Sequence, residues 1–403
     1  MKKKSNKHPL KISVAEAKKI AAVSQGLAGL FSKGKPQDRT LSIIRHLGYV
    51  QIDTLSMVAR AHHHTLFTRS KDYKEHHLDA LMNEKKIFEY WSHAAAYLPM
   101  EDFRFSLPRK HDFRKGKAHW FARDKKMHRY VRDKIKAEGP LQAKDFGAER
   151  KHGSWFDWKP AKIALEQLFQ DGTLMIAGRK GFQKIYDLTE RVLPAGVSDK
   201  LPSDEEYAEY LVRSALRAHG IASQKDMTHL RRGMQEHALK KLKQLLREKE
   251  ILEISVEGVK ENYFVLPGTV AGIATFPELT GTHLFSPFDN LIIRRERLKK
   301  IFNYDFQVEF YLPEHKRKFG YFCLPVLCGD EFIGRMDVKA DRSLKTFFIR
   351  SFHVENPAAV NENTWSAFAA AVKSFAAFNA CEKIKVEKVY PGKYRAELAR
   401  ALR

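Results

Sequence analysis

The chain has 403 residues, more than one hydrophobic core usually organises, so several compact units are expected. Hydrophobic residues make up 43% of it and aromatic residues 11%, which excludes a disordered protein, and no apolar run of about 18 residues indicates a membrane span. The formal net charge of +24 favours a polyanionic partner, and without a long amphipathic basic helix we expect nucleic acid rather than a membrane.

The chain start, MKKKSNKHPLKIS, is basic and no apolar stretch follows its lysines, so it does not predict a secretory signal. A cytoplasmic location is therefore expected. The three cysteines, Cys323, Cys328 and Cys381, fit this compartment, because an odd and sparse set supports neither a disulfide framework nor a zinc finger. Cys323 and Cys328 lie in an apolar stretch and are expected to be buried, and no structural metal is expected.

Three segments repeat one pattern, in which helical periodicity gives way to two short strands joined by a polar turn. The strand pairs are expected at 85–99, 172–194 and 250–268. The helices expected before them lie at 14–31, 38–48 and 77–84 in the first copy, at 130–139, 140–147 and 159–172 in the second, and at 205–220, 222–230 and 235–250 in the third. In the first copy, YVQID (49–53) interrupts the helical pattern.

Three helices followed by a two-stranded wing are typical of the winged helix-turn-helix, which lays one helix in a DNA groove while the wing touches the backbone. The sequence therefore predicts winged-helix modules at 10–108, which includes a catalytic strand, at 109–200 and at 201–268. Small helical bundles with hairpins also occur in interaction proteins, so the fold alone does not name a reaction.

Beyond residue 280 the pattern changes to alternating strands separated by turn residues. Strands are expected at 306–313, 319–329, 331–341 and 345–355, and a closing helix at 364–380. The predicted fold is therefore α+β, with three tandem winged helix-turn-helix modules followed by a small antiparallel β-barrel-like C-terminal domain at 280–403.

The stretch GYVQIDTLSMVARAHHHTLFTR (48–69) contains the candidate catalytic residues. Alternate residues of a strand share a face, so Gln51 and Asp53 are expected side by side with Ile52 turned into the core. The carboxylate could take a proton from a water that the amide orients, and its charge would stabilise an oxocarbenium-like transition state in glycosidic-bond hydrolysis. The alternative is an edge strand whose polar side chains satisfy turn amides.

Six motifs are spread along the chain: QID after GYV, HHHTLFTR, FEYWSHAAAYLP, YDLTERVLP, LFSPFDNLIIRRERLKKIF and GRMDVKADR. With them the chain resembles the YcaQ/AlkZ family of bacterial winged-helix interstrand-crosslink DNA glycosylases. The likeness covers nearly the whole chain, and the Gln-apolar-Asp form resembles the YcaQ branch. It implies Gln51 and Asp53 as catalytic residues, and N7-alkylguanine adducts and interstrand crosslinks in double-stranded DNA as substrates. Since alkylation at N7 makes the purine a cationic leaving group, no general acid is needed. A lyase would need a lysine to form a Schiff base, and no lysine lies beside Gln51 and Asp53 in sequence. We expect a monofunctional enzyme without cofactor that leaves an abasic site.

Several basic residues are candidate DNA contacts. Adjacent histidines on an extended chain point to different faces and lack the spacing of a helical zinc site, so a metal is not expected there. Residues 104–136 hold thirteen lysines and arginines interleaved with aromatic residues, the strongest local basic patch. The candidates are Arg60, His62, His63, His64, Arg69, Arg109, Lys110, Arg179, Lys180, Lys184, Arg231 and Arg232; a solvated charged surface is the alternative for each.

Two other functions remain open on the sequence. A winged-helix transcription regulator would bind DNA without chemistry, but the chain has no obvious dimerisation helix for a palindromic site, and we expect a monomer. A nuclease would need clustered carboxylates for magnesium, and Asp53 has no close acidic neighbour in sequence.

Overall fold

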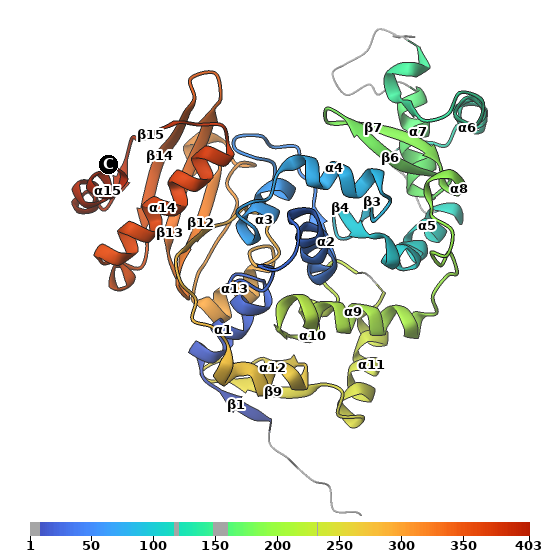
Figure 1. Ribbon diagram of the computed structural model, residues 1–403. Coiled ribbons are helices and arrows are strands. Elements are labelled where there is room, and N and C mark those ends of the chain that lie inside the picture. Colours follow the sequence, from blue (N-terminus) through green and yellow to red (C-terminus); the bar gives the residue numbers. More distant parts are fainter. Residues whose placement is uncertain (1–8, 117–120, 148–159, 232) are drawn as a thin grey trace, which may run out of the picture. The chain divides into compact units, whose positions relative to one another are not determined.

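The computed structural model describes residues 9–116, 121–147, 160–231 and 233–403, and its ribbon is shown in Figure 1. The chain forms two compact units. Unit 1 combines Met1–Gly34, Val50–Tyr73 and Ala208–Arg403, and unit 2 combines Lys35–Tyr49 and Lys74–Tyr207. Each unit contains both helices and sheets, so the mixed α+β class is confirmed, and each is assembled from segments far apart in the sequence.

Unit 2 contains two of the three expected strand pairs. Its helical elements are α2 (Pro36–Leu47), α4 (Glu75–Asn83), η1 (Met100–Ser106), α5 (Leu107–Arg114), α6 (Lys125–Glu138), η2 (Ala143–Phe146), α7 (Pro160–Gln170) and α8 (Thr189–Val192). Its strands are β3 (Ile87–Trp91), β4 (Ala95–Pro99), β5 (Leu141–Gln142), β6 (Leu174–Lys180) and β7 (Gln183–Leu188). Strands β3 and β4 pair antiparallel, as do β6 and β7, so the hairpins expected at 85–99 and 172–194 are confirmed.

The helix expected at 140–147 is wrong. This segment forms the short strand β5, which pairs with β7, followed by the 3-10 turn η2. The Asp145 carboxylate accepts a hydrogen bond of 2.8 Å from the Gln142 amide, and Gly147 leaves the turn at φ 77°. A local side-chain bond and a left-handed glycine thus stop helix growth after one turn.

Unit 1 contains a four-stranded sheet in the order β1-β9-β10-β8. Its strands are β1 (Leu10–Ile12), β8 (Ile221–Ala222), β9 (Leu252–Val256) and β10 (Asn262–Val265), and its nearby helices are α1 (Val14–Ser24), α10 (Gln224–Met227), α11 (Gln235–Arg247), α12 (Pro267–Gly272) and most of α9 (Asp204–His219). The third expected hairpin is confirmed as β9 and β10. The helix expected at 222–230 shrinks to the four residues of α10, which begins after the Ser223 N-cap and is followed at Leu230 by a backbone φ of 55°.

The second sheet of unit 1 is a half-barrel in the order β11-β12-β13-β14-β15, with β16 also paired to β14. Its elements are β11 (Thr282–Leu284), α13 (Arg295–Phe302), β12 (Cys323–Cys328), β13 (Glu331–Asp341), β14 (Thr346–Val354), α14 (Glu362–Phe378), β15 (Lys383–Val386), β16 (Val389–Tyr390) and α15 (Arg395–Leu402). The strands expected at 319–329, 331–341 and 345–355 form β12, β13 and β14, which pair antiparallel as expected. The later strands β15 and β16, which were not predicted, run parallel to β14, so the sheet is mixed.

The closing helix α14 packs its aromatic side chains on this sheet, as its spacing predicts. The Phe368 ring stacks on Phe352 of β14 at 4.9 Å, and the Phe375 ring meets Phe347 edge to face at 5.8 Å. Such pairs add to the free energy gained by burying the apolar area itself.

The strand expected at 306–313 is wrong. In its place the chain makes an irregular loop, closed by the Glu309 carboxylate, which accepts backbone hydrogen bonds from Lys318, Phe319 and Gly320. These bonds pair the amides of residues 318–320, at the start of the strand expected at 319–329, with a side chain, and β12 begins only at Cys323.

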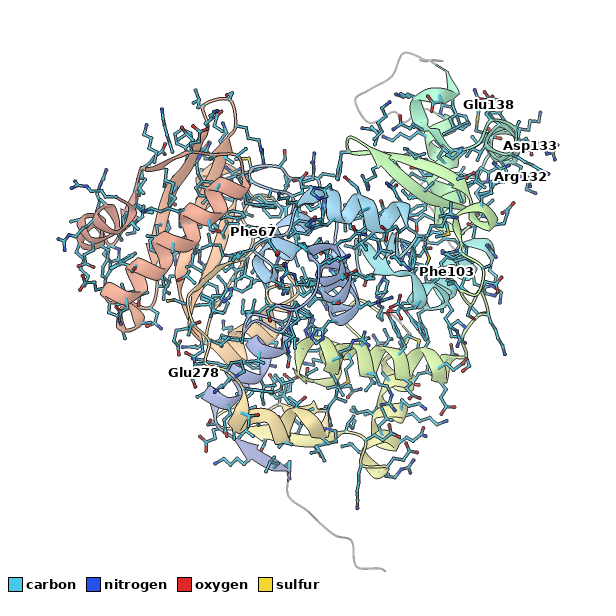
Figure 2. All side chains as sticks on the ribbon, viewed as in Figure 1. Phe67, Phe103, Arg132, Asp133, Glu138 and Glu278 are labelled. Atoms are coloured by element: carbon cyan, nitrogen blue, oxygen red, sulfur yellow. The ribbon has the colours of Figure 1, made fainter. Side chains whose placement is uncertain are left out.

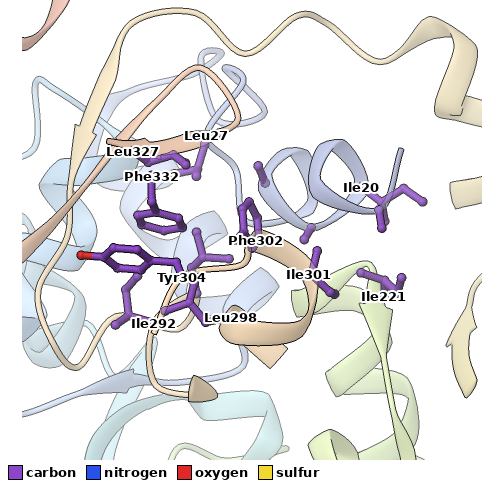
Figure 3. Close-up of a cluster of buried hydrophobic side chains, with 14 of the residues drawn as sticks. Ile20, Leu27, Ile221, Ile292, Leu298, Ile301, Phe302, Tyr304, Leu327 and Phe332 are labelled. Carbon is purple, nitrogen blue, oxygen red and sulfur yellow. The ribbon is translucent and has the colours of Figure 1, made fainter. Parts of the chain in front are cut away.

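A buried hydrophobic cluster joins the earliest and latest parts of unit 1 (Figure 3). Ile20 of α1 belongs to the same cluster as Ile301 of α13 and Phe332 of β13, and the Tyr304 and Phe332 rings stack at 4.4 Å. The first helix therefore depends for its burial on residues almost 300 positions later in the chain.

Candidate active site

Residues 50–60, which contain the predicted catalytic residues and which we call the catalytic segment, begin with β2 (Val50–Gln51) and lead into α3 (Ala61–Arg69) within unit 1. Gln51 is buried, with 8% of its surface exposed, and Asp53 is half-buried. The strand ends at Gln51, so the pleat does not position Asp53. Instead, Asp53 Oδ1 accepts a hydrogen bond of 2.8 Å from the Leu55 amide, an Asx turn that orients the carboxylate.

The half-buried position changes the acidity of Asp53. Burial raises the pKa of its carboxyl group, and the hydrogen bond from the Leu55 amide opposes this only in part. A carboxylate with a raised pKa is a stronger base, which is the property that abstraction of a proton from water requires.

Two long-range backbone contacts hold the catalytic segment in place. The Met57 carbonyl accepts a hydrogen bond of 2.7 Å from the Ala340 amide on β13. The Ala59 amide donates one of 2.6 Å to Asn379 Oδ1, and Asn379, which is 1% exposed, donates in turn to the Phe375 carbonyl at 2.8 Å. The loop after Asp53 is therefore fixed on the half-barrel sheet and on the end of α14.

The three consecutive histidines lie on helix α3, so the extended chain that we expected for them is wrong. All three are buried, with at most 9% exposed. His63 Nδ1 lies 2.7 Å from the Tyr73 hydroxyl, while His64 Nε2 lies 3.0 Å from the Leu284 carbonyl and its ring stacks on Phe375 at 4.2 Å. Burial lowers the pKa of both His63 and His64 to about 3. The neutral, enclosed rings of His63 and His64 support the helix and do not offer charge to a phosphate.

Arg69 ends α3 with a fully buried ion pair. Its guanidinium contacts both carboxylate oxygens of Asp289, at 2.7 and 2.9 Å, and both side chains are 0% exposed. It also donates to the Gln25 carbonyl and to Gln25 Oε1, each at 2.8 Å. Our expectation that Arg69 contacts DNA is therefore wrong, because every direction of its planar group is taken up inside unit 1. Figure 2 labels Phe67, which lies two residues earlier on the same helix.

Two other predicted DNA contacts of unit 1 lie at the surface. Arg60 is the N-cap residue of α3 and is half-exposed, directly after the catalytic segment. Arg231 is half-exposed in the turn between α10 and α11, where its amide donates to the Thr228 carbonyl at 3.0 Å. Arg232 lies outside the described residues.

The predicted contacts on the hairpin β6–β7 of unit 2 differ in their accessibility. Arg179 makes a two-pronged ion pair with Glu89, at 2.9 Å for both bonds, and Lys184 binds Glu166 at 2.9 Å. These two cations are engaged within the unit. Lys180, next to the turn of the hairpin, is exposed and is the member of this group that can reach a phosphate.

Lys110 is enclosed, contrary to its predicted role in binding DNA. Its side chain is 2% exposed, and its ammonium lies 3.8 Å from the Phe103 ring centroid and 4.6 Å from that of Tyr90. Burial lowers the pKa of Lys110 well below its usual value. Arg109 is half-exposed, and its guanidinium packs over the Trp91 ring at 5.0 Å. Figure 2 labels Phe103, the nearest ring to Lys110.

The outer face of α6 forms a basic surface in unit 2. Its exposed cations are Lys125, Lys126, Arg129, Arg132 and Lys136, and the exposed aromatic Tyr130 lies among them. Asp124 caps the helix by accepting hydrogen bonds from the amides of Lys126 and Met127, at 2.9 and 3.0 Å. Arg132 and Asp133 are marked on this helix in Figure 2. Flexible cations on a fixed helix suit binding to a phosphate backbone without reading its sequence.

Sequence reasoning missed the residues that hold the catalytic segment. Asp289 lies in the quoted stretch LFSPFDNLIIRRERLKKIF, yet nothing marks it as the partner of Arg69, 220 positions earlier. Nothing in the sequence marks Asn379 as a contact of residues 50–60, because an asparagine at the end of a helix is common. Among the described residues, no group of three or more His, Cys, Asp or Glu side chains could hold a metal ion. In the same part of the chain, no helix is both long and apolar enough to span a bilayer.

Comparisons with known proteins agree with this arrangement. The family model described as "DNA glycosylase AlkZ-like" matches residues 44–378. This range includes the catalytic segment, all of α14 and, apart from β1, β15 and β16, the strands of both sheets of unit 1. Among solved structures, the chain is similar to Streptomyces sahachiroi DNA glycosylase AlkZ, with 16% sequence identity and a TM-score of 0.64. That match covers 94% of this chain and 100% of the other, so the two share their overall fold. Because the family model spans most of its length, the chain belongs to the AlkZ-like DNA glycosylase family.

Proposed function

We propose that this protein hydrolyses the N-glycosidic bond of N7-alkylated purines in double-stranded DNA, including purines joined in interstrand crosslinks. The observation that carries the proposal is the half-buried Asp53 carboxylate, oriented by the Leu55 amide and two residues after Gln51. In this mechanism the negative charge of Asp53 stabilises the oxocarbenium-like sugar while the C1′–N9 bond breaks and its electron pair neutralises the alkylated purine. Asp53 then takes a proton from the water that the Gln51 amide orients, as the oxygen of that water bonds to C1′.

The remaining parts of the proposal concern how DNA is held. We propose that the three segments of helices followed by a hairpin act as winged-helix modules, in the predicted divisions 10–108, 109–200 and 201–268, ahead of the β-rich domain at 280–403. The half-exposed Arg60 and Arg231 and the exposed Lys180, together with the basic face of α6, would contact phosphates. We also propose that the enzyme works as a monomer, in the bacterial cytosol where its DNA substrate lies.

The test uses purified protein and a duplex carrying one N7-methylguanine, in the presence of EDTA. We expect free N7-methylguanine by mass spectrometry, and a strand break at the lesion only after alkaline treatment, because a monofunctional enzyme leaves an intact abasic site. A duplex with a nitrogen-mustard crosslink should separate into single strands under denaturing conditions. Sequence-dependent binding to undamaged DNA with no release of modified base would instead support a transcription regulator.

The rate of base release is expected to fall on acidification at a higher pH than an ordinary aspartate would give. Only ionised Asp53 can act as a base, and burial raises its pKa above 3.8, so activity is lost as pH falls through this raised value. Single-turnover rates from pH 4 to pH 7, corrected for release without enzyme, measure this acidic limb of the pH–rate profile, in which the rate falls as the pH falls. A limb at or below pH 3.8 would contradict the assignment of Asp53 as the base.

A further inference from the structure

The half-barrel sheet of unit 1 has one face that helix α14 does not cover. Helix α14 lies across the other face, where it packs on Phe347 and Phe352 of β14 (Figure 1). Since successive side chains of a strand point to opposite faces, Phe348 points away from α14. Its ring is half-exposed there. We call this second face, which the proposed mechanism does not use, the outer face.

A row of three side chains crosses the outer face at Phe348. Phe348 pairs with Lys339 of β13 and with Lys385 of β15, so the three residues lie side by side. The Lys385 ammonium lies 5.7 Å from the centre of the Phe348 ring, so the two side chains share this face. Lys339 directly precedes Ala340, whose amide donates to the Met57 carbonyl of the catalytic segment. The row therefore adjoins one of the anchors of the catalytic segment.

A stacked pair of rings follows farther along β14 on the same face. Because Phe352 faces α14, the next residue, His353, faces outward, after a β-bulge at which Arg350 has no partner on β13. His353 pairs with Tyr390 of β16, and the two rings stack at 4.8 Å with 19° between their planes. Tyr390 is 46% exposed, so its ring is held in place and still accessible. From Phe348 to His353 the strand covers about 16 Å.

Cations lie beside these rings. Residues 383–393, KIKVEKVYPGK, contain four lysines and a single glutamate. Lys383 and Lys385 are exposed and alternate along β15, so both lie on the outer face, and Arg350 of β14 is half-exposed. Within the described part of the chain, none of these three cations forms an ion pair. Accessible rings with unpaired cations beside them complement a strand whose bases are free to stack and whose phosphates carry charge.

We propose that the outer face is a stacking platform for single-stranded DNA. Bases stack on Phe348 and on Tyr390, which His353 supports from behind, while Lys383 and Lys385 contact the phosphates. A duplex keeps the faces of its bases inside its own stack, so the platform selects an unpaired strand. The inference rests on the proposed function in one respect: it names, as the preferred substrate of that DNA glycosylase, a lesion in a duplex that adjoins an unpaired strand.

The binding test uses the full chain and a fluorescently labelled oligo(dT) strand, followed by anisotropy. We expect Phe348→Ala and Tyr390→Ala each to weaken oligo(dT) binding about 10-fold and to change affinity for a blunt-ended duplex less than about twofold. Tyr390→Phe should bind like the wild type, because it keeps the ring. Lys385→Gln should reduce the salt slope of oligo(dT) binding by about 0.7. Lys373→Gln, at an exposed lysine of α14 across the sheet, is the matched control and should leave that slope unchanged.

A second arm measures the substrate preference. Single-turnover release of N7-methylguanine is compared between a continuous duplex and the same duplex carrying a single-stranded dT arm beside the lesion, at enzyme concentrations below saturation. We expect the wild type to act faster on the duplex with the arm. Tyr390→Ala should lose this advantage and keep the wild-type rate on the continuous duplex, because the platform holds the unpaired strand and takes no part in the reaction.

Equal binding of oligo(dT) by the wild type, Phe348→Ala and Tyr390→Ala would overturn the platform, as would a Tyr390→Phe variant as weak as the alanine variant. A wild type that acts equally fast on both duplexes would overturn the substrate preference. The outcome is separable from that of the proposed function. If the wild type releases N7-methylguanine while both alanine variants bind oligo(dT) normally, the platform is wrong and the glycosylase stands. If the alanine variants lose oligo(dT) binding but the wild type releases no base, the platform stands and the proposed reaction is wrong.

Discussion

Asp53→Asn is expected to slow the release of N7-methylguanine about 1,000-fold while duplex affinity changes less than about twofold. Asparagine keeps the size of the side chain and an oxygen that can accept the hydrogen bond from Leu55, but it can neither take a proton nor carry negative charge. Single-turnover base release and fluorescence anisotropy with the same lesion duplex measure the two quantities. The variant should also be slightly more stable than the wild type at pH 7, because the raised pKa of Asp53 shows that its ionised form is disfavoured in the folded protein.

The matched control is Asp72→Asn, which makes the same chemical change at an exposed position shortly after α3. It is expected to release base at the wild-type rate. If Asp53→Asn retained full activity, another group would have to be the base. If it lost DNA binding and activity together, Asp53 would belong to the binding surface and not to the reaction.

Arg69→Ala is expected to lower the free energy of unfolding by about 3–5 kcal/mol, because it leaves the Asp289 carboxylate charged and buried without its partner. Urea denaturation followed by circular dichroism measures this loss. Lys299→Ala in the same unit is the control: its ion pair with Asp305 is more than half exposed, so we expect a loss of less than about 1 kcal/mol.

A double variant identifies the source of the cost. Arg69→Met combined with Asp289→Leu removes both charges and should recover most of the stability lost by Arg69→Ala, since well-packed apolar pairs often replace buried ion pairs at little cost. If Arg69→Ala instead lost DNA affinity while its free energy of unfolding stayed unchanged, Arg69 would be a DNA contact after all.

Local patterns in the sequence predicted the elements that depend on near neighbours. The three hairpins and the closing helix were found because alternation and helical spacing are properties of a few consecutive residues. The segment 306–313 alternates just as well, yet it forms a loop in which the Glu309 side chain binds the amides of residues 318–320, a contact at nine to eleven positions that alternation does not reveal. The parallel pairing of β15 with β14 was equally hidden, because the direction of a strand depends on the path of the chain between strands.

The candidate site shows the same division between local and distant information. Gln51 and Asp53 stand out in sequence because an amide and a carboxylate interrupt an apolar stretch. The burial of His64, Arg69 and Lys110 could not be predicted from the sequence, because each is covered by residues from elsewhere in its unit. His64 is covered by Phe375 and Leu284, Arg69 by Asp289, and Lys110 by Phe103 and Tyr90. Charge alone favoured the surface for the last two, and tertiary packing decided against it.

The hydrogen bond between Ala59 and Asn379 spans 320 positions, and this separation has a consequence for synthesis. While a ribosome is still making the chain, residues 50–60 emerge long before α14, so the segment containing Asp53 lacks the anchor that fixes it in the finished protein. A nascent or prematurely terminated chain would therefore carry Gln51 and Asp53 without their mature geometry, and competence to release a modified base would arise only after α14 and Asn379 have been synthesised.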